Sequence, residues 1–310
     1  PQRNNNRTNT IKMRHTIIIA EAGVNHNGDL TLAKRLVDAA ADAGADYIKF
    51  QTFRSEELVA KSAKMADYQK ENLQAEDDSQ LAMLKRLELS EADHRELISY
   101  AAERGIRFLS TAFDLASIDF LHSLQPDFWK VPSGEITNLP YLRKIAEKGG
   151  RVVMSTGMCA ISDVLAAVEA LTDAGVKRDD ITLLHCNTQY PTPFADVNLR
   201  AMQHLADATG LSVGYSDHTV GIEVPIVAVA LGACVIEKHI TLDRTLPGPD
   251  QAASIEPDEL RRMVAAIRNI EQALGSGVKE ITASERPNIA AARKSIVAKR
   301  AIAKGELLSD

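Results

Sequence analysis

Residues 234–240 read Cys-Val-Ile-Glu-Lys-His-Ile, a short apolar and β-branched run that includes two charged side chains and an imidazole. Its length and β-branched content predict a buried strand. The amphipathic stretch 257–274 follows, and Gly275 supplies the residue that often ends a helix. Seven further runs upstream repeat this order of strand and then helix. The alternation predicts βα units and a parallel sheet.

Eight such units are expected in all. The strands are expected at Thr16–Ala20, Asp46–Gln51, Ile106–Ser110, Phe128–Val131, Arg151–Ser155, Ile181–Cys186, Ser212–Tyr215 and Cys234–Ile240. The helices are expected at Leu30–Ala43, Glu91–Arg104, Leu115–Leu124, Pro140–Lys148, Ser162–Ala174, Asn198–Ala208, Ile222–Leu231 and Pro257–Leu274. Eight units over about 260 residues match a (β/α)8 TIM barrel, and an open doubly wound sheet is the alternative.

The ends of the expected strands decide between these two α/β folds. Nearly every strand ends in a polar or reactive residue: Glu21, Lys49, Gln51, Ser110, Thr111, Ser133, Glu135, Ser155, Thr156, Asn187, Ser216, His218 and His239. A closed barrel brings all eight carboxyl ends to one mouth, whereas an open sheet concentrates them at a single crevice. The pattern therefore favours the barrel.

The domain organisation follows from the same map. Residues 1–15 are expected to form a polar tail, residues 16–275 the barrel, and residues 276–310 a linker that leads to a further domain mostly absent from this chain. Two connections are long for a barrel. Residues 53–90 are charged and predict either a lid or a solvated helix, and residues 241–256 hold a Pro-Gly-Pro-Asp turn that ends at Asp250.

Composition excludes several classes of function. The 310 residues carry a net charge of -6 and no long basic run, which argues against a nucleic-acid partner. The apolar runs are too short or too interrupted to span a bilayer, so no membrane association is expected. Three cysteines without CxxC spacing fit a reducing cytoplasm.

His218 and His239 follow the last two expected strands and form a candidate metal site. Neighbouring strands lie about 4.8 Å apart, so the two imidazoles can reach one divalent ion. Two ligands leave positions open to water or substrate, as a Lewis-acid site requires. The alternative is that one or both are structural histidines bonded to the backbone, and spacing alone leaves this open.

Three lysines are also expected near the mouth, namely Lys49, Lys130 and Lys238. An unpaired ammonium is costly to bury, so an anionic partner is expected, and a phosphate or a carboxylate would serve. The hydroxyls of Thr111, Ser133, Ser155 and Ser216 stand at the same level. The alternative for each hydroxyl is a helix cap or a turn. Glu135 is a candidate for proton transfer, or else a partner of Lys130.

Taken together, the strand-end motifs resemble the bacterial sialic acid synthase family, from about residue 16 to the chain end. The motifs are Ala20-Glu21-Ala22-Gly23-Val24-Asn25-His26-Asn27-Gly28, Lys49-Phe50-Gln51-Thr52, Ser110-Thr111-Ala112-Phe113, Lys130-Val131-Pro132-Ser133-Gly134-Glu135, Ser155-Thr156-Gly157-Met158, Tyr190-Pro191-Thr192-Pro193, Gly214-Tyr215-Ser216-Asp217-His218-Thr219, Glu237-Lys238-His239 and Gly248-Pro249-Asp250. Their number and order make the resemblance specific.

The resemblance implies a transferase that condenses phosphoenolpyruvate with an N-acetylated mannosamine-type sugar, giving a nine-carbon 2-keto acid and phosphate. It implies a divalent metal, usually manganese with magnesium or cobalt as alternatives, held by His218 and His239. The phosphoenolpyruvate positions it implies are Lys49, Thr111, Lys130, Ser133, Ser155 and Ser216. The sugar positions it implies are Asn27, Gln51, Phe53, Tyr68, Glu135, Thr188, Tyr190 and Asp250. It also implies a C-terminal antifreeze-like (SAF) domain, begun at Lys304-Gly305-Glu306, and a domain-swapped homodimer.

Three positions look more like the N,N'-diacetyllegionaminic acid synthase branch than like the N-acetylneuraminate-forming members. Those members usually carry Glu, His and Asn where this chain has Asn27, Phe53 and Thr188. An aromatic ring in place of an imidazole suits a 2,4-diacetamido-2,4,6-trideoxymannose, which has a methyl in place of a hydroxymethyl group.

Three other functions remain as alternatives. The first is an N-acetylneuraminate synthase that uses N-acetylmannosamine. The second is a pyruvate aldolase that forms a Schiff base through Lys130 or Lys49. The third is a sugar-binding protein without catalysis, in which both histidines are structural.

Overall fold

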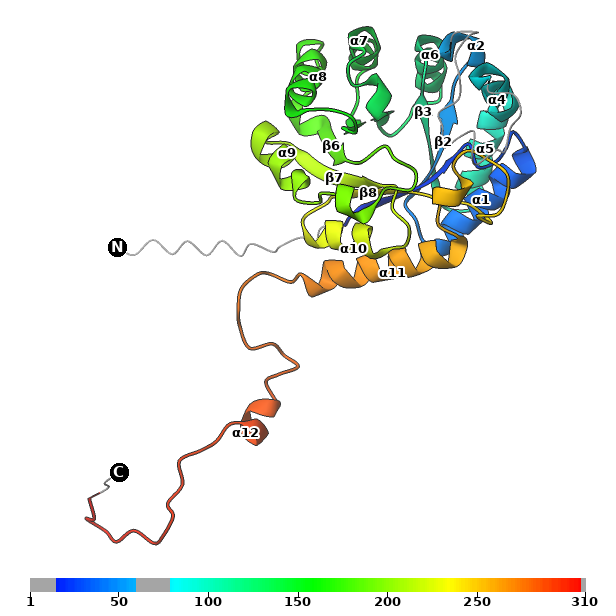
Figure 1. The fold of residues 1–310 in the computed structure, drawn as a ribbon. Coiled ribbons are helices and arrows are strands. Elements are labelled where there is room, and N and C mark those ends of the chain that lie inside the picture. Colours follow the sequence, from blue (N-terminus) through cyan, green and yellow to red (C-terminus); the bar gives the residue numbers. More distant parts are fainter. Residues whose placement is uncertain (1–14, 60–78, 308–310) are drawn as a thin grey trace. The chain divides into compact units, whose positions relative to one another are not determined.

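A computed structural model describes residues 15–59 and 79–307 of the chain. Eight parallel strands form one sheet in the order β3-β2-β1-β8-β7-β6-β5-β4, which rolls into a nearly closed barrel (Figure 1). The strands are β1 (Ile17–Gly23), β2 (Tyr47–Thr52), β3 (Arg107–Ala112), β4 (Trp129–Val131), β5 (Val152–Ser155), β6 (Ile181–His185), β7 (Ser212–Asp217) and β8 (Val235–His239). The (β/α)8 barrel expected from the sequence is confirmed. Four strands run further than expected, since β1 reaches Gly23, β2 reaches Thr52, β3 reaches Ala112 and β7 reaches Asp217.

A helix follows each strand of the barrel. These helices are α1 (Leu30–Ala43), α5 (Glu91–Glu103), α6 (Leu115–Ser123), α7 (Leu139–Lys148), α8 (Ile161–Asp173), α9 (Ala201–Thr209), α10 (Glu223–Ala230) and α11 (Pro257–Ala273). The connection after β2 adds α2 (Ser55–Leu58) and α4 (Gln80–Leu87). Short 3-10 turns stand at Ser133–Glu135, Arg178–Asp180, Phe194–Asp196 and Gln251–Ala253.

Local sequence explains where α1 begins and ends. The carboxylate of Asp29 accepts hydrogen bonds from the backbone N–H groups of Thr31 and Leu32, which the first turn of a helix leaves without partners. Gly44 ends the helix in the left-handed region at φ 80°, where a side chain would be strained. The helix therefore stops where the chain turns into β2.

The side chains of the strands alternate between two apolar surroundings. One set points into the barrel and forms a buried layer of Ile19, Tyr47, Leu109, Phe128, Val153, Leu184 and Val235. The other set, which includes Ile18, Ile48, Tyr215 and Ile236, belongs to a larger cluster shared with helices such as α1 and α11. This alternation fixes which residues of each strand reach the barrel interior.

One joint of the barrel differs from the others. Within the described part of the chain, no hydrogen-bonded ladder joins β3 to β4, the two ends of the sheet. Side chains bridge this joint instead. Asp127, just before β4, accepts a hydrogen bond from the hydroxyl of Tyr47 at 2.8 Å and lies 3.6 Å from a guanidinium nitrogen of Arg107. Tyr141 of α7 donates at 2.7 Å to the carbonyl oxygen of Ala112, where β3 ends.

The chain divides into two compact units, residues 1–274 and residues 275–310. The second unit is largely exposed and contains the short helix α12 (Asn288–Ala292). No helix in the described ranges is long and apolar enough to cross a membrane.

Candidate active site

A cavity of about 360 Å³ opens at the carboxyl ends of the strands. Six of its floor residues lie two positions beyond a residue of the apolar layer, as the alternation of side chains requires, and Ser216 lies two positions beyond Gly214 of β7. Seven polar side chains therefore stand directly on the barrel core: Glu21, Lys49, Thr111, Lys130, Ser155, Ser216 and Glu237. The floor is thus a buried polar layer on an apolar base.

Four charged side chains of this floor neutralise one another. The Nζ of Lys49 lies 2.7 Å from Oε2 of Glu21 and 3.6 Å from Oε2 of Glu237. The Nζ of Lys130 lies 3.4 Å from Oε1 of Glu237. Two ammonium groups thus face two carboxylates, and all four side chains are almost completely buried. An anionic ligand that enters here has to compete with the carboxylates for the lysines.

The two carboxyl groups differ in pKa, and so in how strongly each holds its lysine at neutral pH. Burial raises the pKa of Glu21 to about 7, an effect that the charge of Lys49 only partly offsets. Burial acts on Glu237 in the same direction, but the charges of Lys130 and Lys49 outweigh it and hold the pKa of Glu237 at about 2. Glu237 is therefore ionised at neutral pH, while Glu21 is partly protonated and can exchange a proton.

Hydroxyl groups complete the floor. Lys49 donates to Oγ1 of Thr111 at 3.0 Å, Lys130 donates to Oγ of Ser155 at 2.8 Å, and Ser216 donates to Oε1 of Glu237 at 3.0 Å. Ser133 also lines the cavity, and its Oγ accepts the backbone N–H of Gly157 at 2.9 Å. The hydroxyls expected near the lysines are thus brought to one place.

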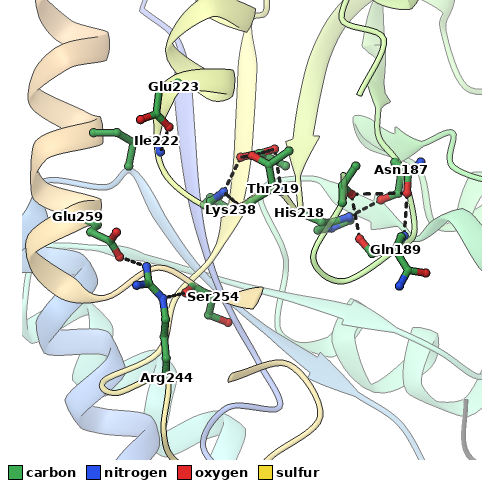
Figure 2. Close-up of polar contacts among 12 residues, drawn as sticks. Asn187, Gln189, His218, Thr219, Ile222, Glu223, Lys238, Arg244, Ser254 and Glu259 are labelled. Atoms are coloured by element: carbon green, nitrogen blue, oxygen red, sulfur yellow. Dashed lines mark hydrogen bonds and ion pairs between the residues drawn. The ribbon is translucent and has the colours of Figure 1, made fainter. Parts of the chain in front are cut away.

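His218 and His239 stand side by side at the edge of this floor. Their ring centroids lie 5.5 Å apart, and the ring of Tyr190 stacks on His218 at 4.1 Å. The Nδ1 of His218 is hydrogen-bonded to the carbonyl oxygen of Asn187 (Figure 2). Nδ1 of His239, by contrast, is buried with no hydrogen-bond partner in the described part of the chain. Only His218 therefore has the backbone bond expected of a structural histidine.

The two imidazoles fit a divalent metal ion. Burial lowers the pKa of both histidines, and for His239 the nearby charges of His218 and Lys49 lower it further. Both rings are therefore neutral at pH 7, the form that binds metal. Within the described residues, no group of three or more His, Cys, Asp or Glu side chains could hold a metal. Two imidazoles would leave the other positions to water or substrate.

One wall of the cavity is apolar. Val24, Phe53, Met83, Leu84 and Leu87 form a buried cluster and line the cavity over the ends of β1 and β2. The residues on α4 were not expected from the sequence. An apolar wall next to a polar floor suits a ligand that is anionic at one end and carries methyl groups at the other.

Several residues expected to face a sugar also line the cavity. They are Gln51, Phe53, Thr188, Tyr190 and Asp250. Burial raises the pKa of Asp250 to about 6. Gln51 approaches Glu21, with 3.5 Å between its Nε2 and Oε1 of the carboxylate. Tyr68 lies outside the described residues.

Two other candidates are not among the residues that line the cavity. Glu135 lies in a 3-10 turn, where its Oε2 accepts a hydrogen bond from Asn138 at 2.7 Å. Asn27 donates at 2.8 Å to the carbonyl oxygen of Pro247. Asn27 therefore supports the loop that carries Asp250.

The expectation that Lys238 projects near the mouth is wrong. Its side chain is fully buried and paired with Asp217 on the outer face of the barrel. Glu237, its neighbour, was missed as a site residue although it lies in the cavity. Side chains alternate along a strand, so Glu237 points to the same face of β8 as His239 and Lys238 points to the opposite face. This rule, applied from His239, predicts both positions.

Comparisons with known proteins agree with this geometry. An N,N'-diacetyllegionaminic acid synthase from Campylobacter jejuni subsp. jejuni serotype O:2 is 54% identical over 298 residues, covering 96% of this chain and 89% of the relative. An N,N'-diacetyllegionaminic acid synthase from Legionella pneumophila is 51% identical, covering 98% of this chain and 87% of the relative.

A solved structure gives the same result at the level of the fold. The N-acetylneuraminic acid (sialic acid) synthetase of Leptospira borgpetersenii, in complex with citrate, superposes with a TM-score of 0.79 at 37% identity. The match covers 90% of this chain and 92% of that one. Residues 36–279 match the NeuB family, so the resemblance drawn from the motifs is confirmed. The chain belongs to the NeuB family.

Proposed function

We propose that the chain condenses phosphoenolpyruvate with 2,4-diacetamido-2,4,6-trideoxymannose to give N,N'-diacetyllegionaminic acid and phosphate. The observation that carries the proposal is the cavity floor, where two buried lysines and four hydroxyls stand beside two neutral imidazoles. The 54% and 51% identity to enzymes named for this product supports the choice of sugar.

Phosphoenolpyruvate would bind on the floor. Lys49 and Lys130 would neutralise its phosphate and carboxylate, and Thr111, Ser133, Ser155 and Ser216 would orient its oxygens. Charge-assisted hydrogen bonds of this kind are strongest in a site that excludes water. The two lysines would exchange part of their contact with Glu21 and Glu237 for contact with the ligand.

In the reaction, C3 of phosphoenolpyruvate bonds to the aldehyde carbon of the open-chain sugar, water adds at C2, and the C2–O bond to phosphate breaks. The metal, which we propose to be manganese with magnesium or cobalt as substitutes, would supply Lewis acidity toward the sugar aldehyde when bound. His218 and His239 would hold it. The tight backbone bond of His218 would fix the orientation of its ring.

Glu21 is our candidate to hold and move a proton. It lies on the cavity floor, whereas Glu135, the candidate from the sequence, is not among the lining residues. The pKa of Glu21 at about 7 lets it accept a proton as the anion binds and donate it to the aldehyde oxygen as the carbon–carbon bond forms. The carboxylate left by that step would then accept a proton from the water that adds at C2. Glu135 remains a prediction for contact with the sugar.

The apolar wall would contact the methyl groups of the sugar. Phe53 stands where a histidine is typical of N-acetylneuraminate-forming members, and it packs with Met83 and Leu84. A hydroxymethyl group buried against this wall would give up its hydrogen bonds to water without gaining a polar partner. A methyl group makes no such hydrogen bonds and so has none to lose.

One experiment tests the function against its alternatives. The purified chain is incubated with phosphoenolpyruvate, Mn²⁺ and either the diacetamido sugar or N-acetylmannosamine, and products are identified by mass. Formation of diacetyllegionaminic acid with release of phosphate supports the proposal. A preference for N-acetylmannosamine identifies an N-acetylneuraminate synthase. If borohydride traps pyruvate on a lysine of the chain, the protein is a Schiff-base aldolase. If neither sugar is turned over, the remaining alternative is a sugar-binding protein without catalysis.

Assembly and location are further parts of the proposal. We infer a domain-swapped homodimer in which an antifreeze-like domain approaches the partner's cavity, and light scattering with the full-length gene product tests it. We infer a cytoplasmic location from the three cysteines, all of which are free thiols. Fractionation of the cells that express the protein tests that inference.

A further inference from the structure

Lys238 and Asp217 form a fully buried ion pair directly behind the two histidines. They are cross-strand neighbours in the register of β7 and β8, and neither side chain is exposed. The Nζ of Lys238 lies 2.5 Å from Oδ2 of Asp217. This pair faces away from the cavity, so it does not bind the substrates.

Thr219 joins the pair to the turn that follows β7. Lys238 donates a second hydrogen bond at 2.5 Å to the carbonyl oxygen of Thr219 (Figure 2). The hydroxyl of Thr219 donates to Asp217 at 3.0 Å, and its backbone N–H donates to Oδ1 at 3.2 Å. The three residues thus form a closed network in which every buried charge has partners.

This network encloses His218 from both sides along the chain. Asp217 precedes the histidine and Thr219 follows it, and both are tied to the residue that precedes His239. Asp217 and Lys238 point outward because side chains alternate along β7 and β8, whereas the two imidazoles line the cavity. The bonds of Lys238 thus link the backbone on both sides of His218 to the residue that precedes His239.

A buried ion pair is a poor way to gain stability, since an apolar pair of the same volume is often as stable or more so. An ion pair does, however, fix the relative positions of the groups that it joins, because charge-assisted hydrogen bonds are directional. Here the second bond of Lys238 ends on a backbone carbonyl, which a methionine or a leucine could not hold. The charge of Lys238 therefore holds the backbone at Thr219, which an apolar side chain of similar size would not do.

We propose that Lys238 is a positioning residue: with Asp217 and Thr219 it holds the turn at His218 at a fixed separation from His239, so that one divalent ion finds both imidazoles already in place. The inference rests on the metal site proposed above. It assigns Lys238 no contact with substrate. It also explains why a lysine stands on the helix-facing side of β8.

The test compares metal affinity with folding stability. The double variant Asp217→Leu/Lys238→Met replaces both charges with apolar side chains, which leaves no buried charge unpaired. Binding of Mn²⁺ to the full chain without substrates is measured by the loss of the free-ion electron paramagnetic resonance signal. Co²⁺ absorption reports the coordination geometry, and thermal unfolding reports stability.

The expected result separates positioning from packing. Mn²⁺ affinity should fall about 10- to 100-fold, the usual effect of removing support behind a metal ligand, while the thermal midpoint stays near that of the wild type. Turnover should show a lower kcat with the KM for phosphoenolpyruvate unchanged. Affinity within about twofold of the wild type, with an unchanged Co²⁺ spectrum, would overturn the inference.

Two further variants complete the design. Arg268→Met breaks another partly buried pair, with Asp46 at 2.8 Å, and serves as the control whose Mn²⁺ affinity should not change. Thr219→Val removes one hydroxyl at nearly constant volume and should weaken Mn²⁺ binding about threefold. If the double variant does not fold, wild-type affinity in Thr219→Val overturns the inference.

Failure of the inference is distinguishable from failure of the proposed function. A wild-type chain that forms the nine-carbon product, and whose double variant binds Mn²⁺ equally well, would overturn only the role of Lys238. A wild-type chain that binds no Mn²⁺ would overturn both the role of Lys238 and the metal part of the proposed function.

Discussion

Lys49 and Glu21 face each other across β2 and β1, with 2.7 Å between Nζ and Oε2, in a place that water scarcely reaches. The pair is unequal, because the pKa of the carboxyl is raised to about 7 by burial while the lysine keeps its charge. An anion that approaches Lys49 repels the ionised form of Glu21. We therefore expect binding of the anion to be coupled to proton uptake.

The first prediction concerns the affinity for phosphoenolpyruvate as the pH changes. Below pH 7 Glu21 is mostly protonated and the anion binds without repulsion. As the pH rises from 7 to 8.5, binding has to reverse the ionisation, so affinity should fall about tenfold beyond what titration of the ligand itself causes. In Glu21→Gln this additional fall should disappear. Isothermal titration calorimetry in buffers of different ionisation enthalpy measures the protons taken up, and equal uptake by both proteins would contradict the prediction.

The second prediction concerns Lys130, which donates to Ser155 and faces Glu237. Lys130→Met should lower kcat/KM for phosphoenolpyruvate about 10- to 100-fold, since it removes a charge-assisted contact in a buried site. Steady-state kinetics with phosphate release gives the value. Lys144→Met, which breaks the more exposed pair with Asp119, is the matched control and should retain wild-type kinetics. Equal loss in the two variants would show that a change in stability, not the site, explains the result.

The third prediction concerns His218. His218→Ala should abolish metal-dependent turnover, because one imidazole is too few to hold the ion in the orientation that the reaction needs. His204→Ala removes an exposed imidazole from α9 and should leave both turnover and Mn²⁺ binding unchanged. Full activity of His218→Ala in the presence of a chelator would remove the case for a metal site here.

The fourth prediction concerns the choice of sugar. Phe53→His should shift the ratio of kcat/KM for the diacetamido sugar over that for N-acetylmannosamine at least about tenfold toward N-acetylmannosamine, because the wall gains a polar group. Competition between the two sugars, read out by product mass, measures the ratio. A ratio unchanged by Phe53→His would place the selectivity elsewhere in the cavity.

Asn27→Glu is the informative comparison. Asn27 does not line the cavity, and it adopts a positive φ of 51°, which asparagine tolerates better than glutamate. This variant should weaken the support of the loop at Pro247 and raise the KM for both sugars alike. A selective change would instead indicate that Asn27 contacts the sugar.

The sequence was sufficient to predict the barrel because strand and helix periods alternate eight times and a polar residue ends nearly every strand. It also placed Lys49, Lys130, His218 and His239 at one mouth, where the cavity brings them together. The errors at Glu237 and Lys238 have one cause. The two residues are neighbours near the end of β8, and only the alternation of side chains along the strand tells which of them faces the cavity.

Other features were beyond reach for a different reason. The wall formed by Met83, Leu84 and Leu87 depends on where α4 docks after the long connection, which is a matter of tertiary packing and not of local pattern. The raised pKa of Glu21 likewise depends on burial and on a partner from another strand. The spacing of residues along the chain predicts neither the docking position of α4 nor the burial of Glu21.

The joint between β3 and β4 gives this barrel a property that the other seven joints lack. Ladders between strands are made of backbone groups, which every residue except proline supplies in full, so most substitutions leave them in place. At this joint side chains make the contacts instead, namely those of Tyr47, Arg107, Asp127 and Tyr141, and a substitution can remove any of them. Substitutions at these four positions therefore change the contacts between the two ends of the sheet and leave every residue that lines the cavity unchanged.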